Sequence, residues 1–316
     1  LHVHKCSTAI SACEKSGQWV PAFALWIYMR QCRMEPDVVT HNVLVSAHGK
    51  GEQWTRALAS FAMIEQVGLE LDATGTNAAL SACEKGKHWT QAVVLLAQMR
   101  LQGPEQDVIT YSAVTSAAGK CQKWRLSLFF LECIQHMGCA PGVITVSSAI
   151  SALKTEMKWT LALVLLADMR WRALLPSVGT YNAAVSTCSG EAWTKALCLL
   201  GDLWQHRLRC DVVTYGALVS SCEKGAAWAC ALQILTDMHG SRLISNSIIF
   251  SAAISANWKG GERGRALRLL KTMRHLSLEP DIAAYNAAVS ACEPTAEWRT
   301  VFKLVEELRQ GGSELD

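Results

Sequence analysis

The sequence lacks the features that would mark a membrane protein, a zinc protein or a familiar enzyme. No apolar run reaches the roughly 18 residues that a membrane-spanning helix needs. Thirteen cysteines are present, but no two are spaced as CxxC, so zinc-ligand spacing is absent. We find no Ser/His/Asp arrangement and no phosphate-binding glycine loop. We therefore expect no metal, no cofactor, no membrane association and no enzymatic activity.

Charge is also scarce. Only 18% of the residues are charged and the net charge is +3, while half of the residues are hydrophobic. This composition excludes a disordered chain. A mild positive excess does not by itself indicate a nucleic-acid partner, so the placement of the cations matters more than their number.

Tryptophan reveals a repeat. Eight of the twelve tryptophans follow a period of 35 residues, with one interval of 34 before Trp193 and one missing member where Arg263 stands. The series is Trp19, Trp54, Trp89, Trp124, Trp159, Trp193, Trp228 and Trp298. Such a period indicates stacked structural units rather than a compact globule.

Residues that recur at other fixed positions of the repeat, here called columns, define a helix that begins near each tryptophan. A small residue follows the tryptophan by three positions (Ala22, Ala57, Ala92, Ser127, Ala162, Ala196, Ala231, Ala266), and Val301 ends that series. Met29, Ile64, Met99, Ile134, Met169, Leu203, Met238, Met273 and Leu308 follow it by ten. Spacings of 3, 7 and 10 share one helix face, so these columns are predicted core.

A second segment with helical spacing precedes each tryptophan and ends in a turn with Gly and Lys. Cys13, Cys83, Cys188, Cys222 and Cys292 share one position in it and are expected to be small buried residues in a reducing compartment. His48 and His88 fall in or near the turns, where a surface position is expected.

The predicted fold is therefore all-α: a right-handed superhelical solenoid of nine helix-turn-helix repeats of about 35 residues, forming a single array over 1–316. The units are 3–37, 38–72, 73–107, 108–142, 143–177, 178–211, 212–246, 247–281 and 282–316. They leave no stretch for a separate catalytic domain. The chain begins at Leu1 with no visible targeting peptide, which is expected of a fragment or a trimmed product.

The units resemble pentatricopeptide repeats of the plain, all-35-residue class, in the variant found in algae. The resemblance rests on Val38-Val39-Thr40-His41-Asn42, Val108-Ile109-Thr110-Tyr111-Ser112, Val212-Val213-Thr214-Tyr215, Glu35-Pro36-Asp37, Glu279-Pro280-Asp281 and the phrase Ser-Ala-Cys-Glu-Lys at 11–15 and 81–85. It covers essentially the whole chain. No deaminase signature (HxE followed by CxxC) is present.

The resemblance implies that each repeat reads one base of single-stranded RNA through its fifth and last residues. The pairs are Ser7/Asp37 and Ser251/Asp281, expected to prefer G; Asn42/Asp72, Asn77/Asp107, Asn182/Asp211 and Asn286/Asp316, expected to prefer U; and Ser112/Gly142, Ser147/Ser177 and Gly216/Asn246, which depart from the strong pairs. The implied target is GUUNNUNGU. An alternative is that these residues only cap helices.

The second residue of each unit is implied to wedge between bases. This column holds His4, Val39, Thr74, Ile109, Ile144, Val213 and Ile248, whereas Gly179 and Ala283 offer little to wedge. A lysine column, Lys15, Lys50, Lys85, Lys120, Lys224 and Lys259, stands thirteenth in six units and is predicted to neutralise RNA phosphates. Its alternative is charge compensation at helix C-termini.

The implied function is sequence-selective RNA binding by a monomer in a chloroplast or mitochondrion, serving RNA processing, stability or translation. RNA-processing proteins are candidates for further partners. The alternative function is a protein-binding helical scaffold.

Overall fold

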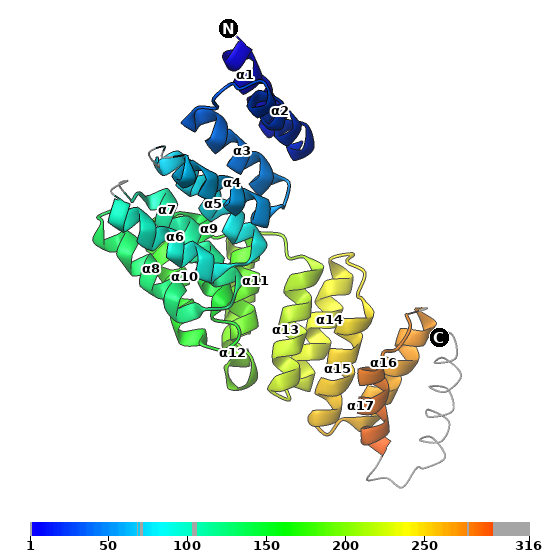
Figure 1. The fold of residues 1–316 in the computed structure, drawn as a ribbon. Coiled ribbons are helices and arrows are strands. Elements are labelled where there is room, and N and C mark those ends of the chain that lie inside the picture. The colour runs from blue at the N-terminus through cyan, green and yellow to red at the C-terminus, as the bar shows by residue number, and fades with distance from the viewer. Residues whose placement is uncertain (1, 68, 70–71, 103–105, 277, 293–316) are drawn as a thin grey trace. The chain divides into compact units, whose positions relative to one another are not determined.

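The computed structural model describes residues 2–67, 69, 72–102, 106–276 and 278–292 (Figure 1). These residues form seventeen α-helices and one short 3₁₀ helix, with no strand among them. The helices are α1 (His2–Lys15), α2 (Trp19–Gln31), α3 (Val38–Lys50), α4 (Trp54–Gln66), α5 (Ala73–Gly86), α6 (Trp89–Gln102), α7 (Val108–Lys120), α8 (Trp124–His136), α9 (Val143–Ala152), α10 (Trp159–Trp171), α11 (Val178–Thr187), η1 (Gly190–Ala192), α12 (Trp193–Gln205), α13 (Val212–Lys224), α14 (Trp228–Gly240), α15 (Ser247–Lys259), α16 (Arg263–His275) and α17 (Ile282–Cys292).

The helix boundaries confirm the predicted hairpins. From α3 onward, each first helix begins at the first residue of a predicted unit, and each second helix begins in the tryptophan column. The last residue of the preceding unit sets the start, because its side chain caps the helix: Asp37 accepts a hydrogen bond from the Thr40 amide at 2.8 Å. In the ninth unit only α17 is described, so Trp298, Val301, Leu308 and Asp316 lie outside the described residues.

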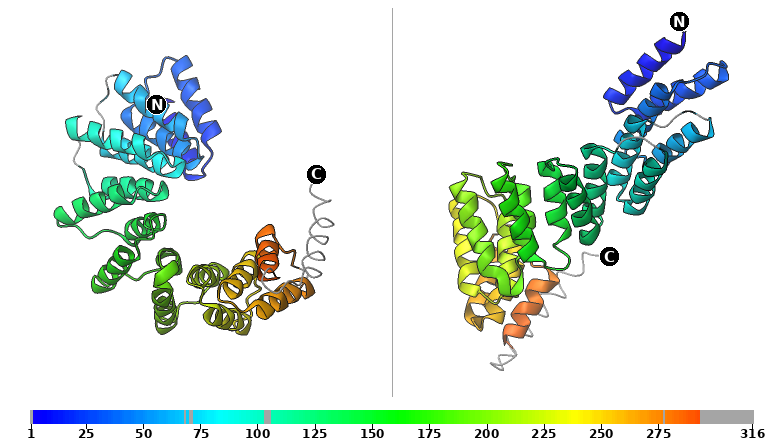
Figure 2. Two further views of the ribbon diagram at one scale, coloured as in Figure 1. Left: turned by 90° about the horizontal axis from the view of Figure 1, so that it is seen from below. Right: turned by 90° about the vertical axis from the view of Figure 1, so that its left-hand side faces the viewer.

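The chain divides into two compact units, Leu1–Ala152 and Leu153–Asp316, and the division falls inside the fifth repeat. Within each unit the first helices contact one another in succession, α1 to α9 in the first and α11 to α17 in the second. Within each unit the second helices pack against the first helices of their own repeat and of the next, as with α4 on α3 and α5 (Figure 2). Each unit therefore has one layer that is a row of first helices.

The predicted core columns are buried. Ala22, Ala57, Ala92, Ser127, Ala162, Ala196, Ala231 and Ala266 are at most 1% exposed, and the column that begins with Met29 is at most 2% exposed through Met273. Among the cysteines of the shared position, Cys83, Cys188 and Cys222 are buried and Cys13 is half-buried. Burial raises the pKa of the Cys83 thiol to about 11.

The columned tryptophans are half-buried and have a specific partner that the sequence did not predict. Each of four rings lies against a glycine in the turn of the next repeat: Trp19 on Gly51, Trp54 on Gly86, Trp193 on Gly225 and Trp228 on Gly260. A Cβ added to Gly260 would lie 2.3 Å from Trp228 Cδ1. At these four junctions the ring occupies the space that a side chain would take, so glycine fits there without a clash.

The expected surface position of His48 is wrong. His48 is 0% exposed and lies between Trp19 and Phe23, with ring centroids 5.8 and 5.5 Å away. Burial lowers the pKa of this imidazole to about 4. His88, in contrast, is half-buried against the Trp54 ring.

Candidate nucleic-acid interface

Four predicted base-reading pairs are joined by direct hydrogen bonds. Each joins the fifth residue of a first helix to the last residue of the same repeat, about 30 residues later. The contacts are Asn42 Nδ2 to Asp72 Oδ1 and Oδ2 (2.8 and 2.9 Å), Asn77 Nδ2 to Asp107 Oδ1 (3.5 Å), Asn182 Nδ2 to Asp211 Oδ1 (3.2 Å) and Ser251 Oγ to Asp281 Oδ1 (2.7 Å). The fold thus brings together residues that the sequence holds far apart.

The aspartates that end the repeats also cap the next helix. The same carboxylate therefore makes both the contact expected of a helix cap and the contact with the fifth residue. Asp107 Oδ1 accepts from the Thr110 amide at 2.8 Å while it faces Asn77. Burial by itself would raise the pKa of Asp107, but the hydrogen bonds from Thr110 and Asn77 outweigh it and hold the pKa below its ordinary value. At Asp211 burial likewise raises the pKa, and the hydrogen bonds from Thr214 and Asn182 outweigh it and lower the pKa. These side chains are therefore carboxylates near neutral pH, and they can only accept hydrogen bonds.

A threonine of the following repeat contacts the pair, which sequence analysis did not predict. The third residue of the following repeat is a threonine in several units, and in two of them its hydroxyl contacts both predicted reading residues. Thr110 Oγ1 is 2.8 Å from Asn77 Oδ1 and 2.7 Å from Asp107 Oδ1. In the first repeat, Thr40 Oγ1 is 2.8 Å from Ser7 Oγ and 2.5 Å from Asp37 Oδ1, so it joins that pair indirectly.

The residues of the irregular pairs make other contacts. Ser147 Oγ donates to the Val143 carbonyl at 2.7 Å, and Ser177 forms a capping box with Thr180. Gly142 and Gly216 have no side chain, so neither can form a side-chain pair with Ser112 or Asn246. Asn286 lies on α17, but its predicted partner Asp316 is outside the described residues.

The two members of a pair differ in exposure. Asn42 and Asn182 are only 6% and 9% exposed, whereas Asp211 and Asp281 are exposed. In the Asn182–Asp211 and Ser251–Asp281 pairs the carboxylate is therefore the more accessible member, whereas Asn77 and Asp107 are both half-buried.

The aliphatic residues at the predicted wedge position are exposed in both units. Val39, Ile109, Ile144, Val213 and Ile248 are 63–75% exposed on the row of first helices, and His4, Thr74 and Gly179 are exposed as well. Burial in a core cannot explain why large aliphatic side chains stand in one column in water. Such a column offers apolar contact to flat, stackable rings.

The lysine column is partly neutralised by a glutamate column that sequence analysis did not identify. Lys50, Lys120 and Lys259 form ion pairs with Glu14, Glu84 and Glu223, the twelfth residues of the preceding repeats, at 2.6, 3.0 and 3.0 Å. Lys85 Nζ donates to the Gly49 carbonyl at 3.2 Å. Lys15 and Lys224 form no ion pair with any residue that the structure describes. All six lie in the last turn of a first helix, where the helix dipole favours cations.

Within the described ranges we find no group of three or more His, Cys, Asp or Glu side chains able to hold a metal. The same residues include no helix with the length and apolar character to cross a membrane.

No protein-family model and no curated protein matches the sequence. Among solved structures, the chain is similar to the pentatricopeptide repeat protein PPR10 from maize, with a TM-score of 0.55 and 21% identity over 97% of this chain and 49% of that one. PPR10 in complex with an 18-nt psaJ RNA element matches with a TM-score of 0.50 and 22% identity over 98% of this chain and 49% of that one. The chain spans about half the length of these neighbours. The chain therefore has the fold of the pentatricopeptide repeat proteins, as its sequence columns predict.

Proposed function

We propose that the protein binds single-stranded RNA along its row of first helices, with one base held by each repeat. Two wedge residues from consecutive repeats lie above and below a base, and the carboxylate with its amide or hydroxyl partner meets the base edge. The structural neighbour PPR10 has been solved with RNA, which supports this class of ligand. The proposed role is binding rather than chemistry, in organellar RNA processing, stability or translation.

One observation carries the proposal: the hydrogen-bonded pairs and the exposed wedges lie in register. Asn77 and Asp107 are joined at 3.5 Å, and the wedge Ile109, which follows Asp107 by two residues, is 64% exposed. Helix capping accounts for the acids but not for an aliphatic column left in water. A binding surface for stacked bases accounts for both features.

The specificity follows from the chemistry of the pair. A carboxylate accepts hydrogen bonds and so favours bases with a ring N–H, namely uracil and guanine. Asn with Asp is proposed to select U, and Ser with Asp to select G. The resulting target is GUUNNUNGU, read 5′ to 3′ from the first repeat.

Binding to this oligonucleotide and to its complement tests the proposal, with fluorescence anisotropy at two salt concentrations. We expect tighter binding to the target. Equal binding to both strands would contradict base reading, and absence of binding to either would favour the protein-binding scaffold.

The register is tested by Asn77→Ser with Asp107 kept. The preference at the third base should move from U toward G, because a hydroxyl replaces the amide. The matched control is Asn257→Ser: Asn257 is buried and its amide donates to the Ala253 carbonyl at 2.8 Å, away from the reading pairs. An unchanged third-base preference in the Asn77 variant would reject the assigned register.

A further inference from the structure

The junction between the sixth and seventh repeats lacks the acid of the Glu–Lys pairs, as does the junction where Lys85 meets the Gly49 carbonyl. At three other junctions the thirteenth-position lysine meets a glutamate at the twelfth position of the preceding repeat, as Lys50 meets Glu14 at 2.6 Å. Lys224 is the thirteenth residue of the seventh repeat, but the twelfth residue of the sixth is Ser189. This is the repeat with the one-residue deletion, where α11 ends at Thr187 and η1 follows at Gly190–Ala192. The deletion and the missing acid coincide.

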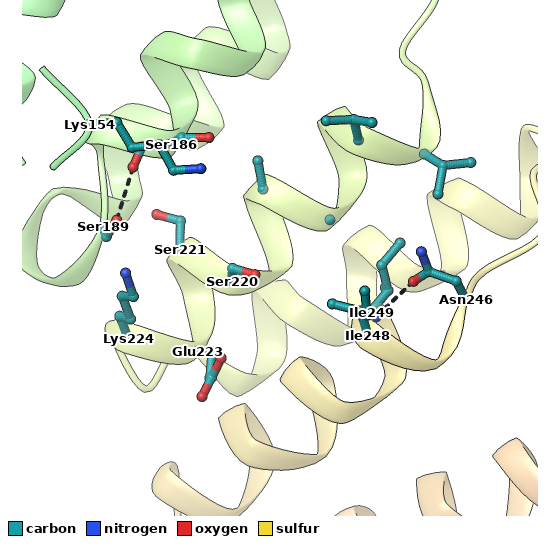
Figure 3. Close-up of a pocket in the computed structure, with 14 residues that line it drawn as sticks. Lys154, Ser186, Ser189, Ser220, Ser221, Glu223, Lys224, Asn246, Ile248 and Ile249 are labelled. Carbon is teal, nitrogen blue, oxygen red and sulfur yellow. Dashed lines mark hydrogen bonds between the residues drawn. The ribbon is translucent and has the colours of Figure 1, made fainter. Parts of the chain in front are cut away.

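A groove of about 480 Å³ lies at this junction. One end is lined by Lys154, Lys224, Ser186, Ser189 and Ser220 (Figure 3). Figure 3 shows Lys154 and Lys224 reaching this end from different segments, with serine hydroxyls between them. The other end is lined by the predicted wedge residues Val213 and Ile248. Gly216 also lines it; this is the fifth residue of the seventh repeat, and it has no side chain.

The two lysines at the polar end of the groove are not paired with an acid. Lys154 and Lys224 are both exposed, and neither ammonium group forms an ion pair or hydrogen bond with a described residue. Glu223 also lines the groove, but its Oε1 is already bound by Ser255 Oγ at 2.7 Å and by Lys259 Nζ at 3.0 Å. Ser220 adds a hydroxyl that makes no hydrogen bond within the described residues.

We propose that this end of the groove binds a phosphate, specifically one backbone phosphate of bound RNA, between Lys154 and Lys224. Two unpaired ammonium groups and a free hydroxyl match an anion that carries several acceptor oxygens. The apolar end of the same groove, between Val213 and Ile248, then receives the adjoining base. This proposal rests on the proposed function and adds Lys154, which lies outside the lysine column.

The seventh repeat would therefore anchor the RNA backbone rather than select a base. Gly216 has no side chain to contact a base edge, so this junction would contact the phosphate without selecting the base.

The first test compares two double variants with equal loss of charge. Lys154→Gln/Lys224→Gln removes the proposed site, while Lys195→Gln/Lys271→Gln removes two exposed lysines from the second helices α12 and α16. RNA affinity is measured against salt concentration by fluorescence anisotropy. We expect the slope of log K against log salt to fall in magnitude by about 0.7 in the first variant, the value for one lost contact on a single strand, and to stay unchanged in the second. Equal slopes in both variants would overturn the proposal.

A second variant restores the ordinary junction. Ser189→Glu places an acid at the twelfth position, where it can pair with Lys224 as Glu14 pairs with Lys50. RNA affinity should fall with the melting temperature maintained, which separates loss of the site from loss of the fold. Unchanged affinity in a folded Ser189→Glu protein would contradict the site.

Inorganic phosphate distinguishes the source of the anion and isolates this proposal from the proposed function. Its ³¹P NMR line should broaden in the presence of the protein and less so with Lys154→Gln/Lys224→Gln. If phosphate binding depends on these lysines while the protein binds no RNA, the anion site stands and the RNA function fails. If RNA binds but its affinity is insensitive to both lysines, the RNA function stands and the phosphate anchor is rejected.

Discussion

Only the nitrogen of the Asn42 side-chain amide forms hydrogen bonds, whereas both the nitrogen and the oxygen of the Asn77 amide do. Asn42 Nδ2 donates to the two oxygens of Asp72 at 2.8 and 2.9 Å, but its Oδ1 is buried without a hydrogen-bond partner. Asn77 Oδ1 lies 2.8 Å from the Thr110 hydroxyl. The difference traces to the third residue of the following repeat, which is Gly75 in one case and Thr110 in the other. That residue therefore positions the asparagine amide.

Replacing Thr110 with valine should loosen the Asn77 pair. The variant keeps the shape of the side chain but removes the hydroxyl that contacts both Asn77 Oδ1 and Asp107 Oδ1. A half-buried acceptor then loses its partner, so we expect the free energy of unfolding to fall by about 1–2 kcal/mol, measured by urea denaturation. Discrimination at the third base should fall more than overall RNA affinity.

Thr76→Val is the matched control for that variant. Thr76 is buried, but its hydroxyl donates to the Asp72 carbonyl within the helix and touches neither reading side chain. It should cost similar stability and leave base preference intact. A parallel loss of third-base discrimination in both variants would show that Thr110 acts only through stability.

The sequence predicted the hairpins because their boundaries depend on local residues. A capping Asp, a helix-period column and a recurring tryptophan each act within one repeat, and α3, α5 and α7 begin where these signals place them. The reading pairs were assigned through the family resemblance, since residues such as Asn42 and Asp72 lie 30 positions apart and share no local signal.

The contacts that sequence analysis missed all cross from one repeat to the next. The Thr110 bridge, the Glu14–Lys50 ion pair and the Trp228–Gly260 contact each depend on how one hairpin lies on its neighbour. The glutamate and glycine columns were visible in the sequence as repeated letters. Their pairing with the lysine and tryptophan columns was not, because a spacing of 32 to 36 residues becomes a contact only after the repeats stack.

The tryptophan–glycine contact predicts opposite effects for two identical substitutions. Gly260→Ala places a Cβ 2.3 Å from Trp228 Cδ1, so the ring must shift and we expect a loss of about 1–3 kcal/mol. Gly201→Ala in α12 meets no atom within 4 Å and should gain about 0.5–1 kcal/mol from helix propensity. Thermal and urea unfolding measure both changes. Equal effects in the two variants would contradict the proposed role of the ring.

His48 should make stability depend on pH. Burial, with a smaller contribution from the Arg56 charge, lowers the pKa of the His48 imidazole to about 4, whereas an unfolded histidine titrates near 6.5. As pH falls, the unfolded chain takes up the proton first. The stabilisation is therefore complete above pH 6.5 and is lost progressively toward pH 4. Between pH 7 and 5 we expect this residue to reduce the free energy of unfolding by about 2 kcal/mol.

His48→Cys tests that prediction with a residue that other repeats carry at the same position, such as Cys83. Urea denaturation at pH 7 and pH 5 should give a smaller difference than in the unsubstituted protein. Burial also lowers the pKa of His41, so adding His41→Tyr, the residue found at this position in Tyr111 and Tyr215, should flatten the profile further. An identical pH profile in all three proteins would exclude these histidines as the source.

The ion pairs change the expected salt dependence of RNA binding. If all six columned lysines contacted phosphates, log K would fall with log salt at a slope of about −4, at about −0.7 per contact. Three of them are paired with Glu14, Glu84 and Glu223, so we expect the remaining three to give a slope near −2. A slope near zero would contradict phosphate neutralisation altogether.

Glu84→Gln is the sharper form of this test, because it releases the Lys120 ammonium held at 3.0 Å. The freed lysine should steepen the slope by about 0.7 and tighten RNA binding at low salt. Glu132→Gln on the second helix α8 makes the same change in net charge away from the lysine column. If both variants steepened the slope equally, net charge alone would explain the effect. A steeper slope confined to Glu84→Gln would mean that the glutamate column sets how many lysines reach the RNA backbone.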